Sequence, residues 1–184
     1  MKQTRKIGTA PDISKIINDE KEYLEIMARL VILDLDNTLI YSDYSARLKV
    51  NQLFKYMDFL YVYERPYARE FIQRCHEVGE VMIFTMAEWE YADQVSVHLN
   101  IRPTRIFSLD DCFIQDGIIR KRVPDLFYEI YDQIIIIDDN PEIWEVQDNE
   151  KCRVFVPTSF TGNKKDQELK MIMEKYLNFT LCNS

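Results

Sequence analysis

Two carboxylates and a hydroxyl follow one apolar run in the segment VILDLDNTL (31–39). Asp34 and Asp36 are separated by a single residue, and Thr38 comes two positions later. Asn37 tolerates turn conformations, and the hydroxyl of Thr38 can bond to nearby backbone groups. The segment therefore predicts a buried strand that runs directly into a turn carrying two acids.

Two other apolar runs end in a similar way. EVMIFT (80–85) ends in Thr85, and QIIIIDD (133–139) ends in Asp138 and Asp139. Acids often follow strands as turn formers or helix caps, and for a single aspartate that is the more common explanation. In an open α/β sheet, however, reactive groups collect beyond the carboxyl ends of the strands. The repetition at three strand ends therefore favours a common site.

Several carboxylates in one pocket repel each other and do not all stay ionised unaided. A divalent cation with oxygen ligands removes this cost, and Mg²⁺ fits because it binds one or two carboxylates together with substrate phosphate. One aspartate can attack phosphorus and form an aspartyl-phosphate, while a second protonates the leaving oxygen and later deprotonates water. The residue types thus indicate magnesium-dependent phosphoryl chemistry.

Apolar runs and helical patterns alternate along the chain, as in a parallel sheet with helices on both faces. The other expected strands are RLVILDL (29–35), TRIFSL (104–109) and CRVFVP (152–157). The expected helices are 12–29, RPYAREFIQRCHEVG (65–79), EWEYADQVSVHLN (88–100), VPDLFYEIYD (123–132) and KKDQELKMIMEKYL (164–177). The predicted fold is α/β and Rossmann-like.

The composition bounds the class of protein. The chain has 184 residues and a formal charge of −8, which argues against a general nucleic-acid binder. Its four cysteines form no CxxC pair, which is typical of reduced thiols. No apolar run approaches the roughly 18 residues of a membrane span, and the N-terminus lacks an apolar signal core. We expect a soluble intracellular monomer, cytoplasmic or nuclear, without direct contact to nucleic acid or membrane.

The segment DLDNTL (34–39) resembles the DxDxT signature of the haloacid dehalogenase superfamily of phosphohydrolases. Its neighbours resemble the small C-terminal-domain phosphatases (FCP/SCP-like, NLI-interacting-factor-like), which dephosphorylate serine or threonine on the RNA polymerase II tail. The matching stretches are ERPYAREFIQRC, VMIFTMAEWEYADQV, IIIIDDNPEIW and VFVPTSFTGNKKDQELKMIMEKYL. The resemblance implies a phosphatase domain over residues 30–178, preceded by a tail and helix (1–29) and followed by a tail (179–184).

The resemblance also implies roles for individual residues. Asp34 would be the nucleophile and a metal ligand. Asp36 would be the general acid and base, and would bind the metal through its backbone carbonyl. Thr38 would fix the loop, and Thr85 would hydrogen-bond a phosphoryl oxygen. Asp138 and Asp139 would complete the magnesium site.

A lysine of the family, which would neutralise the phosphoryl group, has no unambiguous counterpart in GIIRKRVPDL (117–126). Counting from Gly117 favours Lys121, with Arg120 and Arg122 as alternatives or all three as a solvated turn. Asp139 stands where the family often has asparagine. Ser108 lies near the position of a family arginine that grips substrate.

The spacing of the motifs leaves no room for a lid domain. Residues 41–65 suffice only for a small β-hairpin, so the site should be open, which suits a tail of a large substrate better than a small metabolite. The stretch 41–67 is rich in aromatic residues, which either pack on the core or touch substrate. We expect Tyr44 and Arg65, with Thr85 and Lys121, to bind substrate. Other basic side chains there, at 47, 49 and 55, could attract a phosphopeptide or form a solvated face.

These observations predict a magnesium-dependent phosphatase of phosphoserine or phosphothreonine in proteins, acting through an aspartyl-phosphate. A polymerase-tail-like phosphopeptide is one possible substrate. One alternative is a small-molecule phosphatase of the same superfamily. Another is a catalytically inactive binding module with the same fold, although such a relative usually lacks one of the acids and none is missing here.

Overall fold

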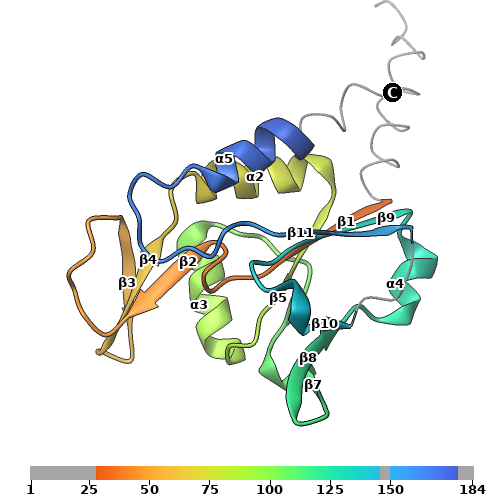
Figure 1. Cartoon of the computed structure of the whole chain (residues 1–184), viewed down its shortest axis with the longest axis horizontal. Coiled ribbons are helices and arrows are strands. Elements are labelled where there is room, and N and C mark those ends of the chain that lie inside the picture. Colours follow the sequence, from red (N-terminus) through yellow and green to blue (C-terminus); the bar gives the residue numbers. More distant parts are fainter. Residues whose placement is uncertain (1–27, 146–149, 178–184) are drawn as a thin grey trace, which may run out of the picture.

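A computed structural model describes residues 28–145 and 150–177 of the chain. Its centre is a five-stranded parallel sheet with the strand order β11-β9-β1-β5-β6 (Figure 1). The strands are β1 (Arg29–Leu33), β5 (Glu80–Phe84), β6 (Ile106–Phe107), β9 (Gln133–Ile137) and β11 (Cys152–Phe155). The parallel α/β sheet expected from the sequence is thus confirmed.

The two faces of the sheet are both buried, which explains why its strands read as continuous apolar runs. Along β1, Val31 and Leu33 belong to one core, whereas Leu30 and Ile32 belong to the other. Helices α2 (Ala68–Val78), α3 (Trp89–Leu99) and α5 (Glu168–Ile172) contribute to the first core. Helix α4 (Asp125–Ile130) packs against the second core (Figure 1).

Helix α2 returns tightly to the sheet through Gly79. A Cβ atom at this position would lie 2.7 Å from the backbone oxygen of Arg29, so only glycine allows the close approach. Helix α5 continues as the π-helical turn η3 (Met173–Leu177). Of the expected helix at 12–29, residues 12–27 lie outside the described residues, and Arg29 already begins β1. The tail 179–184 also lies outside the described residues.

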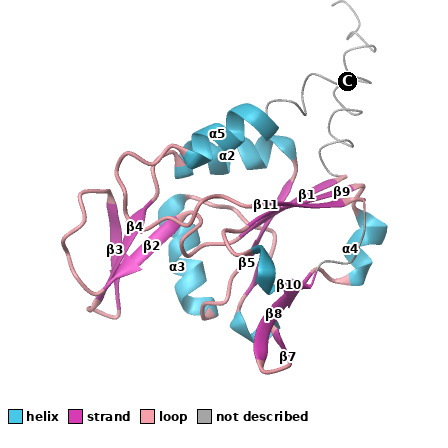
Figure 2. Cartoon of the chain, in the orientation of Figure 1, coloured by secondary structure: helices cyan, strands magenta, loops and turns pink. Residues whose placement is uncertain are grey.

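The insert after the first strand differs from the expected hairpin. It is a three-stranded antiparallel sheet, ordered β2-β4-β3, that stands apart from the central sheet (Figure 2). Its strands are β2 (Ile40–Asp43), β3 (Gln52–Tyr56) and β4 (Leu60–Glu64). The prediction missed β2 because IYSD has little strand pattern of its own, and its extended form depends on pairing with β4.

A second small sheet, ordered β10-β8-β7, lies on the α4 side of the molecule (Figure 2). It contains the hairpin of β7 (Phe113–Gln115) and β8 (Ile118–Arg122), together with β10 (Trp144–Glu145). Two 3-10 turns, η1 (Leu109–Asp111) and η2 (Pro141–Ile143), lead into β7 and β10. Within the described ranges, no helix is long and apolar enough to cross a bilayer.

Candidate active site

Three of the predicted site residues lie one position beyond the end of a central strand, and the neighbouring strand holds each of them by its backbone. Each N–H group donates a hydrogen bond to the last residue of that neighbour. The pairs are Asp34 with Ile137 (3.0 Å), Thr85 with Phe107 (3.0 Å) and Asp138 with Phe155 (3.2 Å). The sheet therefore fixes the starting points of all three side chains at one edge, as the strand-end pattern predicted.

The chain turns sharply after Asp34. The carbonyl of Leu35 accepts hydrogen bonds from the N–H groups of Leu39 (2.8 Å) and Ile40 (3.1 Å), and Asn37 adopts a left-handed conformation with φ 62°. Asparagine tolerates this conformation better than most residues. The turn directs the side chain of Thr38 toward the neighbouring strand end.

Thr38 links this turn to the acidic end of β9. Its hydroxyl donates to Asp139 Oδ1 at 3.1 Å and accepts a hydrogen bond from the N–H of Asp139, also at 3.1 Å. The side chain of Thr38 is fully buried. The predicted loop-fixing role thus corresponds to a two-way bond between two of the predicted segments.

Lys121 is the basic residue that reaches the acids. It lies on β8, and its ammonium donates to Asp34 Oδ1 at 2.7 Å and to Asp138 Oδ2 at 2.8 Å. Neighbouring side chains on a strand point to opposite faces. Arg120 accordingly bonds the backbone of Glu142, and Arg122 forms a surface ion pair with Glu145. Of the three candidates from the sequence, only Lys121 enters the site.

Trp144 is a site residue that the sequence analysis missed. Its indole N–H donates to Asp138 Oδ2 at 2.8 Å, and its backbone pairs with Lys121 where β10 adjoins β8. The other oxygen of Asp138 accepts the N–H of Asn140 at 2.9 Å. Its place in the segment IIIIDDNPEIW was the available signal. Asp138 is therefore held in one orientation by three donors.

Oxygen atoms of Asp34, Asp138 and Asp139 all lie within 4.8 Å of one another. When all three carboxylates are ionised, the single ammonium of Lys121 leaves the largely buried cluster with two net negative charges. Carboxylate oxygen is the ligand type that Mg²⁺ prefers, and a divalent ion would balance this charge. The donor set therefore fits a hard divalent cation.

Burial is the largest influence on the pKa of Asp34. It raises the pKa of Asp34 to about 7, although Lys121 pulls in the opposite direction, and the charges of Asp138 and Asp36 raise it further. For Lys121, burial alone would lower the pKa, but the carboxylates of Asp34 and Asp138 outweigh it and the pKa is raised. The ammonium therefore keeps its proton and its two hydrogen bonds.

Asp36 lies beside this cluster and has partners of its own. Its Oδ1 accepts hydrogen bonds from the hydroxyls of Tyr91 (3.0 Å) and Ser42 (3.2 Å). Burial raises the pKa of Asp36, while these two bonds oppose the rise. The sequence analysis did not single out Tyr91 or Ser42, although Tyr91 belongs to the segment that carries Thr85.

Thr85 is buried, and its Oγ1 accepts the N–H of Ala87 at 3.1 Å. This bond leaves the hydroxyl proton free to donate to an anion. Ser108, the residue near the family's arginine position, instead caps the 3-10 turn η1 through its bonds with Asp111. It thus contributes to local structure at this point of the chain.

The placement of Arg65 contradicts its predicted contact with substrate. The side chain is fully buried and forms an ion pair with Asp166, with distances of 2.9 and 3.0 Å. It also donates to the backbone oxygens of Thr38 (2.9 Å) and Thr158 (2.7 Å). Arg65 therefore ties the loop after β1 to the segment after β11. A sequence pattern cannot reveal this link because Asp166 is 101 positions away.

Tyr44 lies far out on the insert. Its side chain is 75% exposed and stacks on Phe59, with ring centroids 6.0 Å apart. Arg47, Lys49 and Lys55 are also exposed, and Lys55 lies over the ring of Tyr61. The insert thus presents aromatic and basic groups to solvent.

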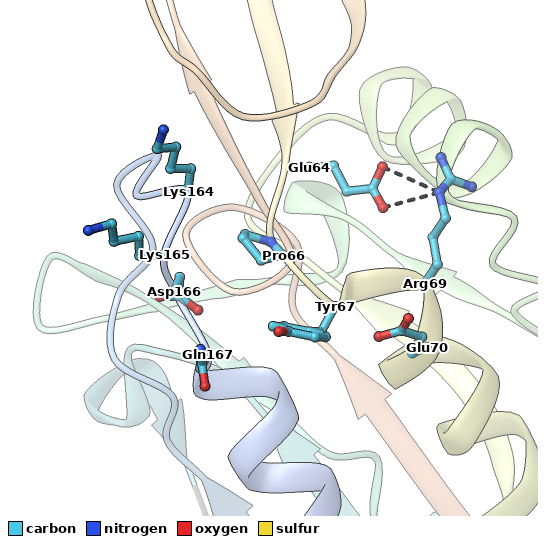
Figure 3. Close-up of a pocket in the computed structure, with 9 residues that line it drawn as sticks. All are labelled: Glu64, Pro66, Tyr67, Arg69, Glu70, Lys164, Lys165, Asp166 and Gln167. Carbon is cyan, nitrogen blue, oxygen red and sulfur yellow. Dashed lines mark hydrogen bonds and ion pairs between the residues drawn. The ribbon is translucent and has the colours of Figure 1, made fainter.

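A pocket of about 370 Å³ lies where the insert, the start of α2 and the start of α5 meet (Figure 3). None of the cluster carboxylates lines it. Glu64 and Arg69 form an ion pair on one wall, and Asp166, the partner of Arg65, lies on the opposite side (Figure 3). The acidic cluster is therefore not part of this pocket.

The comparison with protein families assigns most of the chain. The model of the NLI interacting factor-like phosphatases matches residues 29–182. Among curated proteins, a C-terminal domain phosphatase of RNA polymerase II from Encephalitozoon cuniculi is 28% identical over 140 residues, covering 73% of this chain and 34% of that protein. A human CTD small phosphatase-like protein is 27% identical over 136 residues, covering 70% of this chain and 49% of that protein. The chain therefore spans half or less of the length of these relatives.

Solved structures agree on the fold. A structure of Fcp1, described as an essential RNA polymerase II CTD phosphatase, matches 91% of this chain and 53% of its own with a TM-score of 0.56 and 19% identity. A structure of the fission yeast Fcp1 variant R271A bound to beryllium fluoride matches 93% of this chain and 55% of its own, with a TM-score of 0.54 and 18% identity. The resemblance noted in the sequence is confirmed at the level of family and fold.

Proposed function

The chain belongs to the family of NLI interacting factor-like phosphatases, and on this basis we propose that it is a magnesium-dependent phosphatase of phosphoserine or phosphothreonine in proteins. The observation that carries the proposal is the contact of Lys121 with Asp34 and Asp138 in a carboxylate cluster, with Asp36 two residues beyond Asp34. These groups are the nucleophile, the metal ligands and the acid that phosphoryl transfer through an enzyme carboxylate requires.

In the first step, a carboxylate oxygen of Asp34 attacks phosphorus and the bond from phosphorus to the serine or threonine oxygen breaks. The departing oxygen takes the proton of the Asp36 carboxyl group. Lys121 donates a hydrogen bond to Oδ1 of Asp34, which leaves Oδ2 to attack, and its ammonium faces the incoming phosphoryl group. Thr85 donates its hydroxyl proton to a phosphoryl oxygen. Asp34, Asp138, Asp139 and the Asp36 carbonyl would hold Mg²⁺, which would neutralise phosphate charge so that an anionic nucleophile could approach.

In the second step, the carboxylate of Asp36 takes a proton from water, and the resulting hydroxide attacks the aspartyl-phosphate. The bond between phosphorus and Asp34 breaks, which releases phosphate and restores both carboxyl groups. The sum is one phosphomonoester and one water converted to an alcohol and phosphate. Asp36 thus serves as acid first and base second.

The proposed substrate is a flexible phosphorylated tail. Beside the site, the described residues contain two small three-stranded sheets, the insert and β10-β8-β7, and no larger lid domain that would enclose a metabolite. The two curated relatives are named for action on the C-terminal domain of RNA polymerase II or for likeness to such enzymes. A phosphopeptide of that type is therefore the first substrate to test, and the exposed side chain of Tyr44 on the insert is the proposed contact for it.

The test is hydrolysis of p-nitrophenyl phosphate, a panel of phosphoserine and phosphothreonine peptides, and a panel of sugar phosphates, each with and without Mg²⁺. We expect magnesium-dependent turnover of peptides and complete loss in Asp34→Asn. High rates on sugar phosphates with none on peptides would favour a small-molecule phosphatase. Inactivity on every phosphoester, with tight binding of a polypeptide, would favour a binding module.

A further inference from the structure

Two hydroxyl groups converge on the same oxygen of Asp36. Tyr91, in the first turn of α3, and Ser42, on strand β2 of the insert, both donate to Oδ1. Among the described residues, no donor bonds Oδ2, the other oxygen. Oδ2 is therefore the oxygen of Asp36 that is available to carry and transfer a proton.

The tyrosine hydroxyl is held in place rather than free to rotate away. The side chain of Tyr91 is 5% exposed, and its ring packs edge-on against Tyr56 of strand β3, with centroids 5.1 Å apart. Burial raises the pKa of Tyr91, and the charge of Asp36 raises it further. The packing of the ring thus keeps the hydroxyl beside Asp36.

The insert thus contributes to the site from two directions. It supplies Ser42 directly, and its strand β3 supports the ring of Tyr91. The two donors come from separate parts of the sequence, six positions after Asp36 and 55 positions after it. Both restrain the rotation of the carboxyl group about its last bond, because a partial rotation would move the accepting oxygen away from both hydroxyls.

We infer that Tyr91 and Ser42 are positioning residues, which hold Oδ1 of Asp36 so that Oδ2 is presented to the oxygen that leaves phosphorus. The inference rests on the proposed phosphatase function and on Asp36 as its acid. Holding a catalytic carboxyl group in its working orientation accounts for part of the roughly 10²- to 10⁴-fold that general acid catalysis typically contributes. The effect must depend on how much the leaving oxygen needs a proton.

This dependence separates a positioning role from a structural one. The oxygen of serine leaves as a strongly basic alkoxide unless it is protonated, whereas p-nitrophenolate is a good leaving group without help. The ratio kcat/KM reports on events up to the first irreversible step, in which the phosphorus–oxygen bond breaks. It therefore excludes the later hydrolysis of the aspartyl-phosphate, which is common to both substrates.

The experiment compares kcat/KM of the full chain with Mg²⁺ on a phosphoserine peptide and on p-nitrophenyl phosphate. We expect Tyr91→Phe to lower kcat/KM on the peptide about tenfold and on the aryl phosphate less than about twofold. Ser42→Ala should show the same selectivity with a smaller loss, which provides a second test should Tyr91→Phe fold poorly.

Tyr63→Phe is the matched control. It removes a buried tyrosine hydroxyl from the same insert, one that donates to the backbone of Ser45 at 3.0 Å and does not contact Asp36. We expect no change in the ratio between the two substrates. Equal losses on both substrates in Tyr91→Phe and Ser42→Ala, or no loss in either, would overturn the inference while leaving the phosphatase function intact. Inactivity of the wild-type chain on both substrates would overturn the function and the inference together.

Discussion

Lys121 Nζ lies 2.7 Å from Asp34 Oδ1, although 87 positions separate the two residues in the chain. The contact requires that β8, which belongs to a small peripheral sheet, places a charged side chain at the carboxyl edge of the central sheet. The same ammonium also bonds Asp138, so one cation joins the ends of two central strands. Lys121 therefore compensates part of the negative charge that the acids bring together, and it is expected to matter for stability as well as for turnover.

Removing this ammonium should destabilise the metal-free protein. We expect Lys121→Met to lower the free energy of unfolding by about 3–5 kcal/mol, because two buried carboxylates lose their shared partner. It should also lower kcat by about 10²–10³, the usual effect of losing a group that stabilises transition-state charge. Urea unfolding and steady-state kinetics measure the two effects. Arg122→Met, on the same strand but in an exposed pair with Glu145, should change stability by less than about 1 kcal/mol.

The folded protein without metal should lose stability as the pH rises. Burial raises the pKa of Asp34 to about 7 in the folded state from an ordinary value of 3.8, so the folded state binds the proton more tightly than the unfolded state. The stabilisation is fully present below about pH 4 and is lost as the pH rises to about 7, by an amount of about 1–4 kcal/mol. Unfolding titrations at several pH values measure this trend. Asp34→Asn should flatten it, and a wild-type stability that increases across this window would contradict it.

Magnesium should stabilise the folded chain through the carboxylate cluster. At a concentration about 100 times its Kd, bound metal should contribute about 2.7 kcal/mol. Asp139→Asn removes one charge from the ligand set and should weaken binding about tenfold, which reduces the contribution at the same concentration to about 1.4 kcal/mol. Thermal unfolding with and without Mg²⁺ measures both values. Asp110→Asn, an exposed acid outside the cluster, should leave the shift unchanged, and a shift retained in full by Asp139→Asn would show that this acid is not a ligand.

The buried pair of Arg65 and Asp166 should stabilise the loop after β1, which contains Thr38. Arg65→Met leaves Asp166 and the carbonyls of Thr38 and Thr158 without their donor, so we expect a loss of about 3 kcal/mol in unfolding free energy. Arg65→Lys should not restore it, because an ammonium cannot reproduce the forked contacts. Arg69→Met, which removes a surface pair with Glu64, is the control and should cost less than about 1 kcal/mol. Full stability of Arg65→Met would show that this link is dispensable.

The site residues that the local sequence pattern predicted lie where strands of the central sheet end. Runs of apolar, β-branched residues identified β1, β5 and β9, and the acids and threonines that follow them do meet at one edge. This worked because burial on both faces of a parallel sheet leaves a continuous signal in the sequence. A different signal, the tolerance of asparagine for turn conformations, placed Asn37 in a turn, where it adopts a positive φ.

The polar partners of these residues were not accessible to the same reasoning. Tyr91, Ser42 and Trp144 look like ordinary core or strand residues, and only the fold shows that their donors reach Asp36 and Asp138. Arg65 looked like an exposed basic residue because its partner Asp166 is distant in the chain. Local periodicity reports which face of an element is buried, whereas a hydrogen bond between remote segments depends on how the elements pack.

The backbone bonds that hold Asp34, Thr85 and Asp138 have a consequence for motion. Each of the three amide protons belongs to the hydrogen-bonding ladder of the central sheet, although its residue lies beyond the strand proper. Such protons exchange with solvent only when the sheet itself opens. The backbone at these three positions is thus as rigid as the core, and any larger movement near the acidic cluster must come from the surrounding loops and the insert.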